Sequence, residues 1–200
     1  MTESDWAACR DPQMMLDLVR ERGQASDRKL RLFACACCRL MDRRGNASGL
    51  AVVELAEQVA DGLLPLADAL GQEPAGGCRL IMDCWALDGD PWSRVARSFA
   101  VTAQAWRTLP RAPLLRDLFG DPFRPATLDP AWRTATVVSL AHAAYDDRQL
   151  PEGTLDPARL AVLADALEEA GADGPTLGHL RAPGPHVRGC FVIDLLLNRA

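Results

Sequence analysis

Hydrophobic residues recur every three or four positions over most of the chain, the spacing that gathers them on one face of a helix. In residues 48–61, for example, Val52, Leu55, Ala56 and Val59 form one apolar stripe. Helical patterns also predict helices over residues 12–22, 26–43, 65–70, 78–87, 91–109, 114–119, 130–146, 157–170, 176–181 and 186–199. No alternating run bounded by hairpin turn residues indicates a strand. We therefore predict an all-α, bundle-like domain of about ten helices, some of them short.

Asp-Pro dipeptides mark four of the predicted helix starts. Their aspartates are Asp11, Asp90, Asp129 and Asp156. The carboxylate accepts hydrogen bonds from the free amides of a first turn, and proline fits the first helical position because its missing N–H had no partner there. Asp121-Pro122 is the exception, because a second proline follows at Pro125 and indicates a loop.

Length and composition fit a folded globular protein. The chain has 200 residues, of which 48% are hydrophobic and 24% charged, and this apolar content excludes a disordered chain. We expect one domain over residues 1–200. The glycine-bearing stretch 71–77 is the place where it would subdivide.

The charge balance and the terminus bear on compartment and partners. The net charge of −5 argues against a nucleic-acid-binding protein, and no apolar run approaches the roughly 18 residues of a membrane span. The acidic start, residues 1–5, lacks the regions of a signal peptide. We expect a cytoplasmic protein with reduced thiols, since the seven cysteines show no disulfide framework.

Ligand-type side chains concentrate in two places. One is the Cys35-Ala36-Cys37-Cys38 segment, and the other contains His179, His186 and Cys190. Thiolates and imidazoles are ligands that zinc prefers in proteins. One hypothesis is therefore a zinc-binding helical module, in which Cys35 or Cys38 completes a site with the three carboxyl-terminal residues. The spacing matches no known zinc pattern.

The carboxyl-terminal group has two other interpretations. A helix over 186–199 would place His186, Cys190 and Asp194 on one stripe. Apolar residues surround that stripe, so we favour a buried helix in which the imidazole and thiol only pack. A Cys–His pair is also typical of a nucleophile and its base, so a small thiol-dependent enzyme using Cys190 or Cys35 is a further hypothesis.

The predicted helix 26–43 places Cys35 among Arg28, Arg31 and Arg39, with Cys38 at the flank. Nearby guanidinium groups favour a thiolate and make a thiol more reactive. The alternative that we favour is that another element covers this face and Cys35 is an inert buried residue. We expect the arginines themselves to be solvated or salt-bridged.

Phe119, Phe123 and Arg124 define a candidate partner surface. They lie in the stretch 116–125, which combines two phenylalanines with two prolines in a predicted loop. Such apolar residues are usually packed onto the body of the protein, which is the interpretation that we favour here. If they were exposed, they would mark a site for a protein partner.

Familiar catalytic motifs are missing from the sequence. It holds no GxxxxGK[ST], GxGxxG, GxSxG, HExxH or EF-hand loop. We assign no catalytic or cofactor-binding residue, and the leading hypothesis is a non-enzymatic interaction or regulatory module with a protein partner.

Several phrases of the sequence are distinctive as a set. They are Trp6-Ala-Ala-Cys-Arg-Asp-Pro12, the segment 26–39, Leu115-Arg-Asp-Leu-Phe-Gly-Asp-Pro-Phe-Arg-Pro125, Leu128-Asp-Pro-Ala-Trp132 and Pro185-His-Val-Arg-Gly-Cys190 with Asp194-Leu-Leu-Leu197. On these phrases the chain resembles a paralogous family of uncharacterised bacterial proteins expanded in planctomycetes. The resemblance covers most of the chain outside 62–110. It implies a cytoplasmic helical module, sometimes attached to other domains, and it carries over no catalytic residue.

Overall fold

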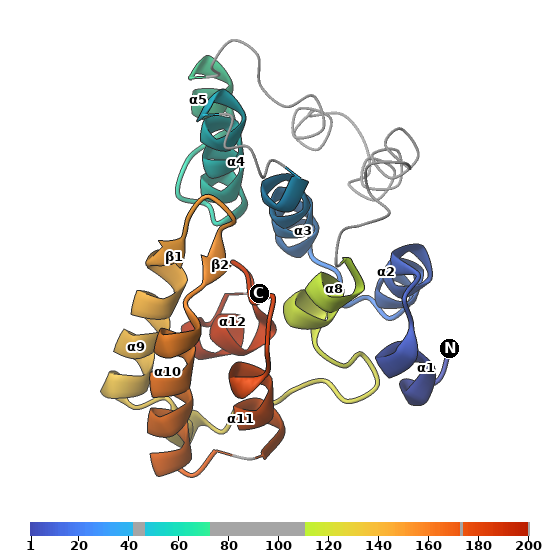
Figure 1. Cartoon of the computed structure of the whole chain (residues 1–200), viewed down its shortest axis with the longest axis vertical. Helices are drawn as coiled ribbons and strands as arrows, with labels where there is room; N and C mark the ends of the chain where they lie inside the picture. Colours follow the sequence, from blue (N-terminus) through green and yellow to red (C-terminus); the bar gives the residue numbers. More distant parts are fainter. Residues whose placement is uncertain (42–46, 73–110, 173, 200) are drawn as a thin grey trace. The chain divides into compact units, whose positions relative to one another are not determined.

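The computed structural model describes residues 1–41, 47–72, 111–172 and 174–199, and these are mostly helical (Figure 1). The all-α prediction is confirmed. The predicted helices over 78–87 and 91–109 lie outside the described residues. None of the helices in the described ranges has both the length and the hydropathy that a bilayer crossing demands.

The chain forms two compact units. Unit 1 contains Met1–Gln24 and Ala112–Ala200, and unit 2 contains Ala25–Arg111. We predicted one domain over residues 1–200, and the stretch 71–77, named as the place where it would subdivide, falls mostly outside the described residues.

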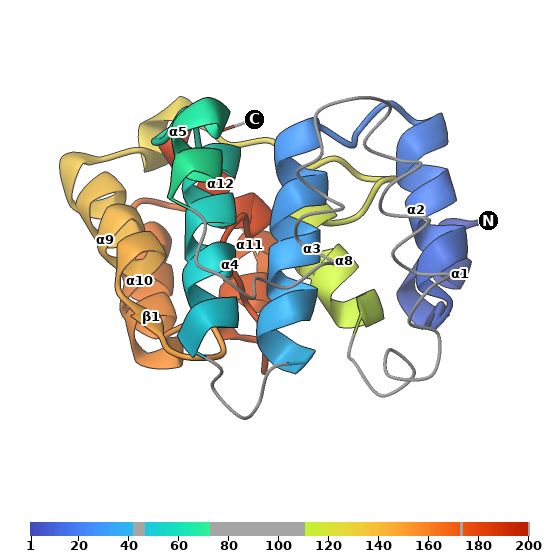
Figure 2. The same cartoon turned by 90° about the horizontal axis from the view of Figure 1, so that it is seen from above.

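Unit 2 contains α3 (Asp27–Met41), α4 (Ala47–Ala60) and α5 (Leu66–Gly71). Helices α3 and α4 lie side by side (Figure 2). The buried Arg39 binds the carboxylate of Glu57 at 2.8 Å and that of Glu54 at 2.6 Å. Arg28 pairs with Asp61 at 2.9 Å. Arg28 and Arg39 of this arginine-rich face are therefore salt-bridged.

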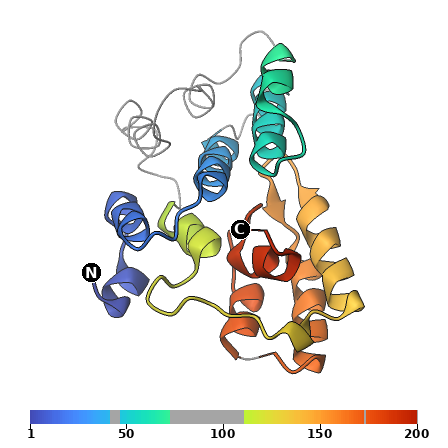
Figure 3. The ribbon, with the colours of Figure 1, turned by 180° about the vertical axis from the view of Figure 1, so that it is seen from behind.

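Unit 1 holds the remaining elements. They are α1 (Glu3–Ala8), α2 (Pro12–Glu21), α8 (Arg111–Phe119), η2 (Pro130–Trp132), α9 (Ala135–Asp146), β1 (Arg148–Gln149), β2 (Thr154–Leu155), α10 (Pro157–Glu169), α11 (Gly174–Arg181) and α12 (Phe191–Leu197). Helices α9 to α12 surround a core that includes Val137, Tyr145, Leu163 and Ile193. Strands β1 and β2 pair antiparallel in a short hairpin. The view from behind shows the long connection from α8 to η2 and α9 (Figure 3).

Two of the Asp-Pro helix starts are confirmed. Asp11 accepts from the amide of Gln13 at 2.9 Å, and Asp156 accepts from that of Ala158 at 2.9 Å. The prediction of one helix over 130–146 is wrong, because Asp129 starts only a single 3-10 turn. A second cap then begins α9, where the Thr134 hydroxyl accepts from the amide of Val137 at 3.2 Å.

The predicted helix over 186–199 is also wrong at its start, because α12 begins at Phe191. The preceding residues are extended: Val187 bridges Thr154, and the carbonyl of His186 accepts from the amide of Leu155 at 2.8 Å. Gly189, with φ of 90°, then turns the chain into the helix. His186 and Cys190 therefore do not share a helical stripe.

Packing of the α9–α12 core is tested with two adjacent positions of α10. Leu163 is fully buried, whereas Val162 is 53% exposed. We expect Leu163→Ala to lower the free energy of unfolding by about 2–5 kcal/mol through lost burial and a cavity. Val162→Ala should change it by less than about 0.5 kcal/mol. Urea titrations followed by circular dichroism measure both, and equal effects would contradict this account of the core.

Candidate metal centre

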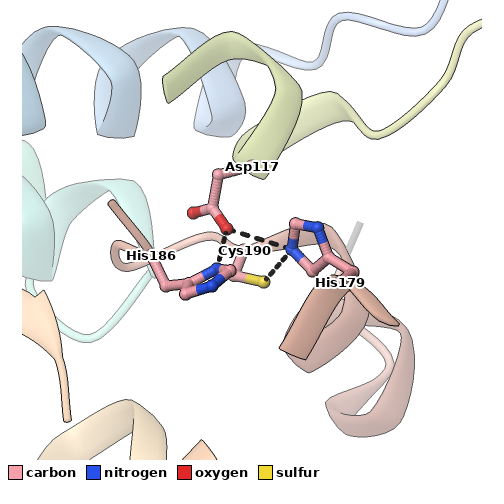
Figure 4. Close-up of side chains that lie close together, drawn as sticks. All are labelled: Asp117, His179, His186 and Cys190. Carbon is pink, nitrogen blue, oxygen red and sulfur yellow. Dashed lines mark hydrogen bonds and ion pairs between the residues drawn. The ribbon is translucent and has the colours of Figure 1, made fainter. Parts of the chain in front are cut away.

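Four potential metal ligands from separate parts of the sequence converge in unit 1. They are Asp117, His179, His186 and Cys190 (Figure 4). One donor atom of each residue lies within 4.8 Å of the donors of the other three. Three of the four residues are buried, and His179 is partly exposed.

Each donor is positioned by a different piece of local structure. Asp117 projects from α8, which is otherwise apolar on its buried face. His179 lies in the last turn of α11. His186 lies in the extended segment that is tied to β2, and Cys190 is the N-cap residue of α12. The site therefore forms where the ends of α11 and α12 meet the side of α8.

The donor atoms have spacings suited to a single ion. Asp117 Oδ1 lies 2.7 Å from His186 Nδ1 and 3.1 Å from His179 Nε2. That same His179 nitrogen lies 3.3 Å from Cys190 Sγ. Neighbouring ligand atoms of a tetrahedral zinc ion are about 3.3–3.8 Å apart, given metal–ligand bonds of about 2.0–2.3 Å. Small side-chain shifts would bring these donors around one ion.

Outer hydrogen bonds orient two of the donors. The amide of Val187 donates to Asp117 Oδ2 at 2.8 Å, which leaves Oδ1 facing the cluster. His186 Nε2 lies 3.1 Å from the carbonyl of Ala182 and donates to it. A histidine ligand whose second nitrogen donates to a carbonyl is the common arrangement in metal centres.

The hydrogen-bond partners of His186 limit what can lie between this side chain and Asp117. Because the Ala182 carbonyl and the Asp117 carboxylate both only accept, a neutral His186, with a single ring N–H, can donate to just one of them. When the hydrogen is on Nε2 and donates to Ala182, the Nδ1 lone pair and Asp117 Oδ1 repel each other at 2.7 Å. Either a proton on Nδ1 or a cation bound to both atoms is needed to relieve this repulsion.

Burial and the close spacing of the donors shift the pKa values of Asp117, His186 and Cys190. Burial raises the pKa of Asp117, but hydrogen bonds and positive charge from the two imidazoles outweigh it and hold that pKa below its usual value. Burial lowers the pKa of His186, but the Asp117 carboxylate and the Ala182 carbonyl raise it overall. Burial and the Asp117 charge raise the pKa of the Cys190 thiol well above its usual value.

The geometry is unlike that of a catalytic triad. In a Cys–His–Asp triad the thiol and the carboxylate contact opposite nitrogens of the imidazole. Here His179 presents one nitrogen, Nε2, to both Cys190 and Asp117. An activated cysteine also has a lowered pKa and an accessible sulfur, whereas Cys190 is fully buried and its pKa is raised. The convergence of the donor atoms on one point favours a set of metal ligands over a catalytic triad.

The structure brings together three of the five residues that the sequence suggested as ligands. His179, His186 and Cys190 meet, and their fourth partner in the described residues is Asp117, which sequence reasoning missed. Cys35 and Cys38 lie on α3 in unit 2, where both are buried. The available signal for Asp117 was a single acid within the apolar turn Leu114–Phe119.

The candidate partner residues Phe119, Phe123 and Arg124 lie at the end of α8 and in the loop that follows it. The guanidinium of Arg22 stacks 4.0 Å from the centroid of the Phe123 ring. Arg124 is exposed and pairs with Glu3 at 2.9 Å. These contacts attach the loop to the amino-terminal segment, and a role in partner binding stays a prediction.

No family model, no curated protein and no solved structure matches this chain. The interpretation of the centre therefore depends on its own geometry.

Thiol reactivity separates a ligand from a nucleophile. We expect iodoacetamide to label Cys190 of the native, metal-free protein at least about tenfold more slowly than the partly exposed Cys9, because Cys190 is fully buried and its raised pKa leaves less thiolate. Peptide mass spectrometry of timed samples measures both rates. Preferential labelling of Cys190 would instead support a thiol-dependent enzyme.

Proposed function

We propose that the chain is a zinc-binding helical module whose ion is held by Asp117, His179, His186 and Cys190. The observation that carries the proposal is the convergence of these four donor atoms within 4.8 Å of one another. The orientation of Asp117 and His186 by outer hydrogen bonds supports it further.

The donor set favours zinc among the common metals. One thiolate and two imidazoles suit a borderline-soft ion, whereas calcium and magnesium take mainly oxygen ligands. Four protein ligands complete a tetrahedral shell, which is typical of a structural zinc ion that stabilises the fold. On this basis we propose a non-enzymatic role for the module, in which zinc joins α8 to the α11–α12 segment.

Metal content tests the proposal directly. Protein that is treated with a chelator and then dialysed against zinc should retain one equivalent of zinc. Inductively coupled plasma mass spectrometry measures this content. His186→Ala should lose this equivalent, because it removes a ligand and leaves three. His142→Ala is the matched control, since His142 is exposed on α9 and should leave the zinc content unchanged.

A folding defect is separated from a binding defect by a second measurement. The circular dichroism of metal-free His186→Ala should match that of the metal-free parent protein. Replacing zinc by Co²⁺ gives a thiolate absorption band that should be present in the parent and in His142→Ala, and lost in Cys190→Ala. Equal zinc content in all variants would refute this ligand set.

Zinc affinity should increase with pH. Bound zinc needs a Cys190 thiolate and a neutral His186, and the pKa of each group is raised, so protons compete with the ion at neutral pH. Between pH 6 and 7 we expect affinity to rise about 10- to 100-fold, tenfold for each proton fully released. Competition with a chromophoric chelator measures it. In Cys190→Ala, which has one proton fewer to release, the zinc affinity should rise about tenfold less over the same pH range. An affinity that does not change with pH would contradict the assignment.

A further inference from the structure

Two neighbouring side chains of α8 contact different parts of unit 1. Asp117 faces the α11–α12 segment, where it contacts two imidazoles and the Val187 amide. Arg116 faces the amino-terminal segment, where its Nη2 donates to the carbonyl of Trp6 at 2.8 Å and to that of Cys9 at 2.6 Å. Helix α8 therefore connects the candidate metal centre to the end of α1.

Other contacts of the amino-terminal segment join it to the loop that follows α8. Arg22 donates from Nη1 to the carbonyl of Pro122 at 3.0 Å, and its guanidinium covers Phe123. Glu3 pairs with Arg124. These contacts all go to α8 or to the loop after it, so the order of α1 depends on how firmly α8 is held.

A cleft of about 590 Å³ lies beside the centre. Trp6 and Arg116 line it from α1 and α8, and His179 and Phe191 line it from α11 and α12. Its volume is in the range of small-molecule sites. Of the four donors, His179 is the one that lines the cleft, so the ion site and the cleft share a wall.

The end of α8 also packs closely against α12. Gly120 has φ of +67°, and a Cβ atom there would lie 3.2 Å from the Phe191 ring. This close approach sets the position of one cleft wall against the other. The joint between the walls thus consists of the Gly120–Phe191 contact and the hydrogen bonds of Asp117.

We infer that the metal ion controls this cleft: bound zinc fixes α8 against α11 and α12, and Arg116 transmits the restraint to α1. The inference rests on the proposed function. Without an ion, the joint opens locally when a few hydrogen bonds break. With an ion, the same opening must separate a ligand from the metal, so it becomes rarer. Zinc thereby sets how long the cleft stays formed.

Hydrogen exchange of the full-length protein tests this control. We expect zinc to slow amide exchange in α1 and its C-cap residue, residues 3–9, roughly tenfold in the parent protein. Arg116→Met keeps the apolar stem but removes the guanidinium, so this variant should still bind one zinc while α1 gains several-fold less protection than in the parent. Arg10→Met is the matched control, because Arg10 is exposed in the same segment, and it should behave like the parent.

The outcomes separate this inference from the proposed function. Zinc that binds without slowing exchange in α1 would overturn the control of the cleft and leave the zinc site intact. Protection of α1 that is undiminished in Arg116→Met would also overturn it, because general stabilisation of unit 1 would then be the cause. A parent protein that binds no zinc would overturn both.

Discussion

The buried carboxylate of Asp117 is the interaction on which the site depends. A carboxylate that is 3% exposed is costly unless positive charge or donors surround it. Val187 supplies one donor to Oδ2, and Oδ1 is left among two imidazoles and a thiol. This arrangement is satisfied by a proton or, more fully, by an ion. The packing of α8 against α11 and α12 follows from where that charge must sit.

Helices with strong local signals were predictable from the sequence. Asp11 and Asp156 each cap a helix whose apolar period is clear, and the starts of α2 and α10 are as expected. The predictions failed where tertiary contacts override local pattern. Asp129-Pro130 carries the same cap signal but begins only one turn, and His186 lies in a segment that extends along β2 instead of coiling.

The site was predictable only in part, for a related reason. His179, His186 and Cys190 are within twelve residues, so their clustering is visible in the sequence. Asp117 is 62 residues from His179 and 69 from His186, and no local pattern links an acid on one helix to imidazoles that far along the chain. Cys35 and Cys38 were attractive as thiols, yet they are buried residues of α3 in unit 2 and do not belong to the group of four donors. Residue type identified candidates, and only the fold could select among them.

The sequence distance between Asp117 and its partners has a consequence for assembly. The segment between them contains α9, the β1–β2 hairpin and α10, so the complete donor set exists only when the two ends of that segment have met. Closing so long a loop is slow compared with forming a helix. An ion bound early by His179, His186 and Cys190 would lack its fourth ligand until Asp117 of α8 came into contact with it. Coordination by all four ligands would then distinguish folded unit 1 from its folding intermediates.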